Sequence, residues 1–126
     1  MGFPSPAADY ISQRLSLDEH LIAHPSSTYF MRAGCSHYRD GIVQGALLVV
    51  DMSLSPCDGS LLVCVLDGEF KIKRYRKHPK PHLENLENGK KEALPEDYDT
   101  TSPVFGVITY IVNDARSGEF DDCPVL

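Results

Sequence analysis

The chain contains 126 residues, of which 42% are hydrophobic, and it carries a formal net charge of −6. This length suits a single domain with a modest core. The acidic balance argues against a protein that works by binding nucleic-acid phosphates, and no apolar run reaches the roughly 18 residues of a membrane-spanning helix. The sequence also lacks the basic-then-apolar pattern of a signal peptide, so we expect a cytoplasmic protein.

Composition divides the chain into three parts. Residues 2–8 are rich in proline and small side chains, which predicts an extended N-terminal arm over residues 1–15. Residues 16–115 contain the apolar runs and form the expected domain. A polar, acidic tail follows over residues 116–126.

The domain is expected to open with a short helix. Ser16 and Glu19 have the spacing of a capping box, which predicts a helix that runs through Ile22 and ends before Pro25. Residues 29–31, Tyr-Phe-Met, then favour a first strand.

A hairpin is the clearest local prediction. Residues 46–50 and 61–66 are near-continuous apolar runs of strand length. Asp67-Gly68 follows the second run directly and leads into residues 70–75. An Asp-Gly pair between two strand-like runs is a strong signal for a two-residue hairpin turn.

Further strands are expected towards the C-terminus. Residues 76–102 are polar and broken by prolines, but a structureless loop of that length is uncommon in a compact domain. We therefore expect a short strand near residues 82–84. Residues 104–112 form the last clear strand, and the whole pattern predicts a small, mostly-β fold.

The basic residues and the cysteines have ordinary interpretations. Six of the ten residues 71–80 are Lys or Arg, and we interpret this basic cluster as a solvated face. Zinc-site spacings are missing, so we expect free thiols, no metal site and no cofactor. The four cysteines are Cys35, Cys57, Cys64 and Cys123.

Ser36 and Lys73 are the residues whose chemistry stands out. A serine hydroxyl becomes a nucleophile when a base takes its proton, and a lysine is such a base only when burial keeps it neutral. Ser-Lys pairs are a known way to build a peptidase. Alternation along the hairpin arm places Lys71 on the same face as Lys73, so Lys71 is a second possible base. The ordinary alternatives are a turn serine and a surface lysine.

Five ordered segments resemble UmuD-type SOS mutagenesis proteins, a family related to the LexA-type self-cleaving peptidases. They are residues 2–10, 24–30, 47–51, 67–70 and 104–107. The resemblance implies a small LexA/UmuD-like peptidase fold: mostly β, made of twisted antiparallel strands, with an extended N-terminal arm and one or two short helices.

The resemblance also implies a catalytic Ser36 and Lys73. The family serine lies in Gly-x-Ser-Met, which corresponds to residues 34–37, Gly-Cys-Ser-His. The separation of 37 residues between Ser36 and Lys73 agrees with the family spacing. Counting forward from the first strand without a gap selects His37 instead, whereas counting back from the following glycines selects Ser36, which we favour. His37, Arg39 and Ala46 depart from the family pattern around the serine.

The function that the resemblance implies is a role in SOS mutagenesis. Members of the family cleave their own Cys-Gly bond just before Phe-Pro-Ser-Pro, and this sequence, which opens Met1-Gly2-Phe3, is similar to the processed product. We expect a homodimeric accessory subunit of an error-prone translesion DNA polymerase. Its partners would be a UmuC-type catalytic subunit and the RecA filament, with no membrane and no sequence-specific nucleic acid. The alternatives are an active Ser-Lys peptidase that cleaves a partner chain in trans, and a LexA-type repressor fragment.

Overall fold

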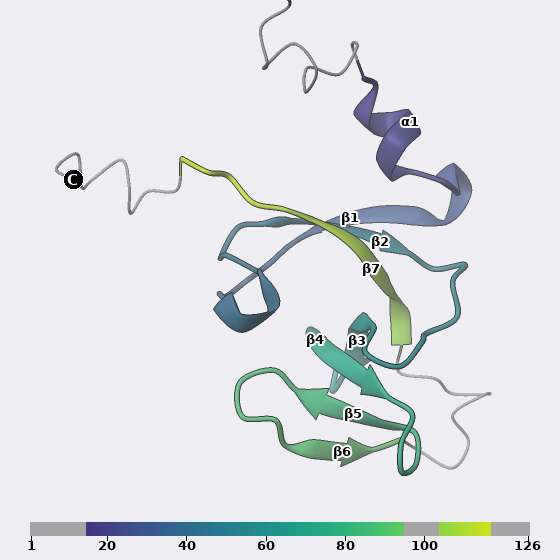
Figure 1. Ribbon diagram of the computed structural model, residues 1–126, viewed down its shortest axis with the longest axis vertical. Coiled ribbons are helices and arrows are strands. Elements are labelled where there is room, and N and C mark those ends of the chain that lie inside the picture. The colour runs from purple at the N-terminus through teal and green to yellow at the C-terminus, as the bar shows by residue number, and fades with distance from the viewer. Residues whose placement is uncertain (1–14, 95–103, 117–126) are drawn as a thin grey trace, which may run out of the picture.

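The computed structural model describes residues 15–94 and 104–116, which form one antiparallel sheet of seven strands with a short α-helix at one end (Figure 1). This architecture confirms the predicted LexA/UmuD-like, mostly-β fold. Nearly all of the predicted arm and tail lies outside the described residues.

The strands do not follow one another across the sheet in chain order. Their spatial order is β1-β2-β7-β3-β4-β5-β6, so the last described strand lies between β2 and β3. Short 3-10 turns lie at Pro25–Ser27 and Tyr38–Asp40. The elements are α1 (Leu17–Leu21), β1 (Thr28–Arg32), β2 (Leu47–Asp51), β3 (Leu61–Leu66), β4 (Glu69–Arg76), β5 (His82–Asn85), β6 (Lys91–Ala93) and β7 (Val104–Val112).

The start of the helix and the turn of the hairpin lie where local sequence signals predict them. The Ser16 hydroxyl accepts a hydrogen bond from the backbone N–H of Glu19 at 3.5 Å, and α1 begins at Leu17. Between β3 and β4, Asp67 has a φ of 52° and Gly68 a φ of 77°. Two successive left-handed residues are what a type I′ turn requires, and they bring Leu66 opposite Glu69.

The described part of the polar stretch after the hairpin, up to residue 94, contains two strands. The predicted strand near residues 82–84 is present as β5, which pairs with β4 through Tyr75 and Leu83. The sequence did not predict β6, a three-residue strand of charged and small side chains that pairs with β5. A strand this short has too few residues to show a period of two.

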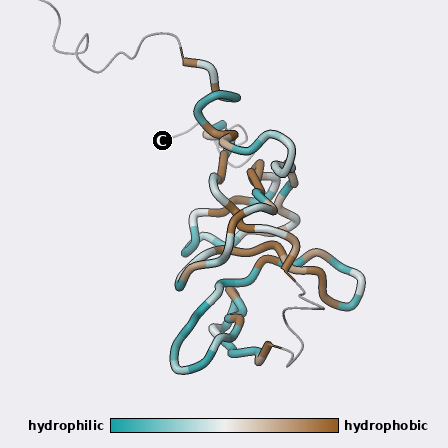
Figure 2. Tube along the Cα trace, turned by 90° about the vertical axis from the view of Figure 1, so that its right-hand side faces the viewer, coloured by the Kyte–Doolittle hydropathy of each residue, from teal (hydrophilic) through white to brown (hydrophobic). Residues whose placement is uncertain are grey.

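The sheet buries apolar side chains on both faces. One face is covered by the segment between β1 and β2, and its buried cluster consists of Ala33, Ile42, Ala46, Leu48, Val50 and Val63. The opposite face buries a smaller cluster of Leu62, Cys64, Tyr75, Leu83 and Val107. Figure 2 shows hydrophobic segments crossing the middle of the molecule. We call the face that buries Val63 the first face of the sheet, and the face that buries Leu62 the second face.

The interpretation of the basic cluster as a solvated face is wrong for its centre. Lys73 is only 5% exposed, and the side chains of Arg74 and Arg76 are 24% and 38% exposed. Arg74 pairs with Asp40, and Arg76 pairs with Asp58 and Glu84. Alternation along β4 sends Lys73 to one packed face of the sheet and Arg74 to the other, which a count of charges along the sequence does not reveal.

Candidate functional site

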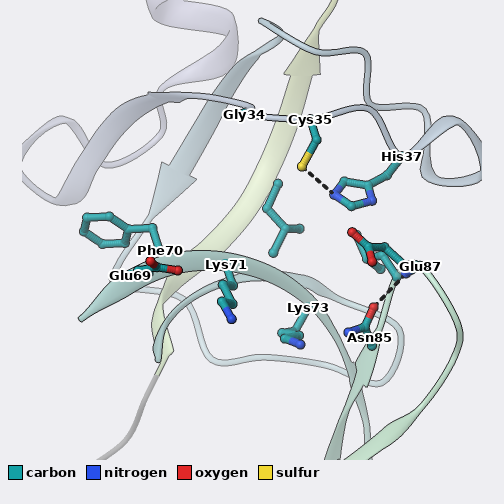
Figure 3. A pocket seen from close by; sticks show the side chains of 11 residues that line it. Gly34, Cys35, His37, Glu69, Phe70, Lys71, Lys73, Asn85 and Glu87 are labelled. Atoms are coloured by element: carbon teal, nitrogen blue, oxygen red, sulfur yellow. Dashed lines mark hydrogen bonds between the residues drawn. The ribbon is translucent and has the colours of Figure 1, made fainter. Parts of the chain in front are cut away.

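A cavity of about 360 Å³ lies where the segment after β1 approaches β4 (Figure 3). Gly34, Cys35 and His37 line it from the first segment, while Phe70 and Ile72 line it from β4. Asn85, the last residue of β5, closes it together with Leu86 and Glu87 of the turn that follows. Three of the four residues that match the family's serine motif therefore line the cavity, and the fourth, Ser36, does not.

Ser36 faces a different hollow. Its hydroxyl oxygen accepts a hydrogen bond from the backbone N–H of Gln44 at 2.8 Å. Ser36 lines a neighbouring hollow of about 420 Å³, which His37 and Glu87 also line. Ser36 does not line the cavity that Cys35 and His37 enter.

Lys73 lies on the second face of the sheet. It pairs directly with Leu62 of β3, and its ammonium Nζ donates a hydrogen bond to Glu92 Oε1 of β6 at 2.9 Å. Figure 3 shows Lys71 and Lys73 leaving β4 on the side away from Cys35 and His37. The predicted shared face of Lys71 and Lys73 is confirmed, and burial of the candidate base is present.

The two candidate catalytic residues thus have separate hydrogen-bond partners in this conformation. Ser36 is bonded to the backbone of Gln44, and Lys73 is bonded to Glu92. The Ser36–Lys73 dyad stays a prediction. Sequence reasoning missed Glu92 as the partner of the lysine, because the pairing of β5 with β6 brings Glu92 to Lys73 and no local motif marks it.

The segment that carries Ser36 is anchored to the sheet by side chains. Arg74 donates hydrogen bonds to the Asp40 carboxylate and, at 2.7 Å, to the carbonyl of Gly59. Asn113, the residue after β7, also holds this segment: its side chain accepts a hydrogen bond from the N–H of Val43 at 3.1 Å and donates one to the carbonyl of Gly41 at 2.9 Å. These contacts explain why a loop with little secondary structure has a defined position over the first face.

The second face is a poor place for a reactive thiol. Burial raises the pKa of Cys64 to about 12, and the nearby Lys73 charge only partly opposes that effect. Cys64 is completely buried, so we assign it a packing role. Cys35 and Cys57, by contrast, are exposed free thiols.

A second polar cluster lies around Asp51 at the end of β2. The carboxylate accepts from the hydroxyl of Ser53 at 2.6 Å, lies 2.7 Å from Nδ1 of His24, and accepts from the hydroxyl of Ser27 at 3.1 Å. These bonds, first among them that of Ser53, hold the pKa of Asp51 far below its usual range. Ser27 and Ser53 both contact the carboxylate and not the imidazole. The cluster therefore stabilises the turn after β2 and is not a Ser-His-Asp triad.

Neither a metal cluster nor a membrane helix is found in the described part of the chain. Residues 15–94 and 104–116 contain no group of three or more His, Cys, Asp or Glu side chains placed to hold a metal ion. Within the same residues, no helix has the length and apolar character needed to cross a membrane.

Comparison with known proteins identifies the family. The sequence model of the peptidase S24-like family matches residues 1–100. The chain is 38% identical over 118 residues to the protein ImpA of Salmonella typhimurium, covering 91% of this chain and 79% of that protein. It is also 38% identical to SamA of Salmonella typhimurium strain LT2 over 117 residues, covering 92% of this chain and 81% of SamA, and to MucA of Escherichia coli over 110 residues, covering 86% and 75%. The predicted kinship with UmuD-type SOS mutagenesis proteins is confirmed, and the chain belongs to the peptidase S24-like family.

Proposed function

We propose that this protein is a dimeric accessory subunit of an error-prone translesion DNA polymerase in SOS mutagenesis. The observation that carries the proposal is its 38% identity, over about nine tenths of its length, to ImpA and SamA. The partners would be a second copy of the chain, a UmuC-type catalytic subunit and the RecA filament. In this role the protein acts by binding other proteins.

Exposed apolar side chains on one end of the sheet support a binding role. Phe30 on β1 is 53% exposed, and Tyr110 and Val112 on β7 are 41% and 43% exposed. Phe30 and Val112 line a shallow, largely apolar groove of about 310 Å³ that is bounded by α1. Large apolar side chains that stay exposed together are typical of protein-binding surfaces.

Oligomeric state and partner capture test this role. We expect the purified chain to sediment as a dimer in analytical ultracentrifugation and to co-purify with a UmuC-type polymerase. Phe30→Asp should lower both signals, because it places a charge on the apolar groove. Val65→Asp is the matched control, since Val65 is 41% exposed on β3, away from the groove. A monomer at micromolar concentration that also fails to bind the polymerase would refute the accessory role.

A Ser-Lys peptidase acting in trans is the second candidate, supported by family membership and by the burial of Lys73. Ser36 would attack the scissile carbonyl while a neutral Lys73 takes the hydroxyl proton. Catalysis requires both residues to leave their present partners, because Lys73 is bonded to Glu92 and Ser36 to Gln44. The proposal therefore includes a rearrangement of the segment that carries Ser36 when a substrate chain binds.

Cleavage between two versions of the chain tests this candidate. The substrate is a form extended through an intact Cys-Gly junction and carrying Ser36→Ala, so that it cannot cut itself. Cleavage by the unmodified chain should be lost with Lys73→Ala and kept with Lys71→Ala, its neighbour on the same face. No cleavage at alkaline pH, where lysine is neutral, would refute the peptidase and leave the accessory role standing.

A further inference from the structure

Cys35 and His37 form a side-chain pair on either side of Ser36. The Sγ atom of Cys35 lies 3.9 Å from Nε2 of His37, within hydrogen-bonding range for sulfur (Figure 3). The two side chains meet at this distance, while the hydroxyl of Ser36 between them accepts a hydrogen bond from the N–H of Gln44. A thiol in contact with an imidazole is the arrangement that activates cysteine nucleophiles.

The pair opens into the cavity described above. Cys35 is exposed, and both residues line this space of about 360 Å³, a volume typical of small-molecule sites. The charged residues that line it are Glu69, Lys71, Lys73 and Glu87. The side chains of Lys71 and Lys73, however, leave β4 on the side away from Cys35 and His37 (Figure 3).

We propose that Cys35 is a nucleophilic thiol with His37 as its general base, and that the site reacts with small alkylating electrophiles. Nε2 of His37 accepts the thiol proton as the sulfur attacks the electrophilic carbon. A carbon–sulfur bond forms, the bond to the leaving group breaks, and the leaving group departs with its electron pair. The proposal is independent of the accessory role and of the Ser36–Lys73 dyad, because it uses neither residue of that pair.

The backbone around His37 is fixed independently of its imidazole. The N–H of His37 donates to the carbonyl of Ile42 at 2.8 Å, and the N–H of Ile42 donates back to the carbonyl of His37 at 3.1 Å. Ile42 is completely buried in the first-face cluster. A substitution of His37 that keeps a polar side chain should therefore remove the base and leave the position of Cys35 intact.

The other cysteines supply internal controls for an alkylation experiment. Cys57 is also exposed, but no described histidine contacts its thiol, so it reports the rate of an ordinary surface cysteine. Cys64 is completely buried and reports folding, since it reacts only if the chain opens. The experiment treats the full chain with iodoacetamide at pH 7, quenches at intervals, and measures alkylation of each cysteine by peptide mass spectrometry.

We expect Cys35 to react at least about tenfold faster than Cys57, because a positioned base contributes up to roughly 10²–10⁴ in rate. His37→Gln should lower the Cys35 rate to that of Cys57 and leave Cys57 and Cys64 unchanged. Equal rates for Cys35 and Cys57 in the unmodified chain would overturn the proposal without any variant. A Cys35 rate that survives His37→Gln while Cys64 stays protected would overturn the role of the imidazole.

Discussion

Lys73 of β4 and Glu92 of β6 form an ion pair across β5, with 2.9 Å between Nζ and Oε1. The lysine side chain is only 6% exposed, whereas that of Glu92 is 40% exposed. The pair thus joins a buried cation to a carboxylate at the edge of the sheet. It neutralises a charge that would otherwise be buried alone.

Glu92→Ala is expected to lower the free energy of unfolding by about 1–3 kcal/mol, because it leaves a buried ammonium without its partner. Urea denaturation followed by circular dichroism measures the change. Lys91→Ala, at the exposed neighbouring position, is the matched control and should have little effect. Adding Lys73→Met should recover part of the loss, since an apolar side chain needs no counter-charge. Equal stability of Glu92→Ala and the parent chain would show that the ion pair contributes nothing.

Asp51 predicts an acid-dependent loss of stability. Its folded-state pKa lies well below its unfolded value of about 3.9, so its contribution is complete above pH 4 and is lost as the pH falls towards the folded pKa. Asp51→Asn should lower the free energy of unfolding at pH 7 and flatten its decline between about pH 4 and pH 2. Urea denaturation at several pH values measures both effects.

Asp67→Asn controls for the charge change in that experiment. Asp67 is exposed in the hairpin turn, and Asn-Gly forms the same type of turn as Asp-Gly. The substitution removes one negative charge without disturbing the Asp51 cluster. If Asp51→Asn and Asp67→Asn gave the same stability at pH 7 and the same pH profile, the hydrogen bonds to Asp51 would have no energetic role.

Gly106 of β7 packs tightly against the end of β2. A Cβ atom at this position would lie 2.6 Å from Cγ1 of Val50 and 3.3 Å from the carbonyl oxygen of Asp51. Gly106→Ala should therefore cost about 1–3 kcal/mol of stability through overpacking. Thermal denaturation of the variant measures the loss.

Val50→Ala provides the compensating change, because it removes the methyl group that the new Cβ would meet. The double variant should be more stable than the sum of the two single effects predicts. Gly34→Ala is the control, since no atom lies within 4 Å of a Cβ there and its backbone is not left-handed. Additive effects of Gly106→Ala and Val50→Ala would contradict the proposed clash.

Local sequence signals determined much of the sheet. The Asp67-Gly68 turn set the register of β3 and β4, and the Ser16 cap set the start of α1. The apolar run predicted over residues 104–112 matches β7 from end to end. These features follow from side-chain periodicity and turn chemistry, which act over a few neighbouring residues.

The tertiary structure alone decided which residues meet at the candidate site. Long-range pairing places β7 between β2 and β3 and brings β6 beside β5, and that pairing supplies Glu92 as the partner of Lys73. The path of the segment over the first face turns Ser36 towards Gln44 and leaves Cys35 against His37. The sequence by itself determined the strands, the hairpin and the candidate residues, because those depend on local spacing. Their partners depend on how distant segments pack, and only the folded chain settles that.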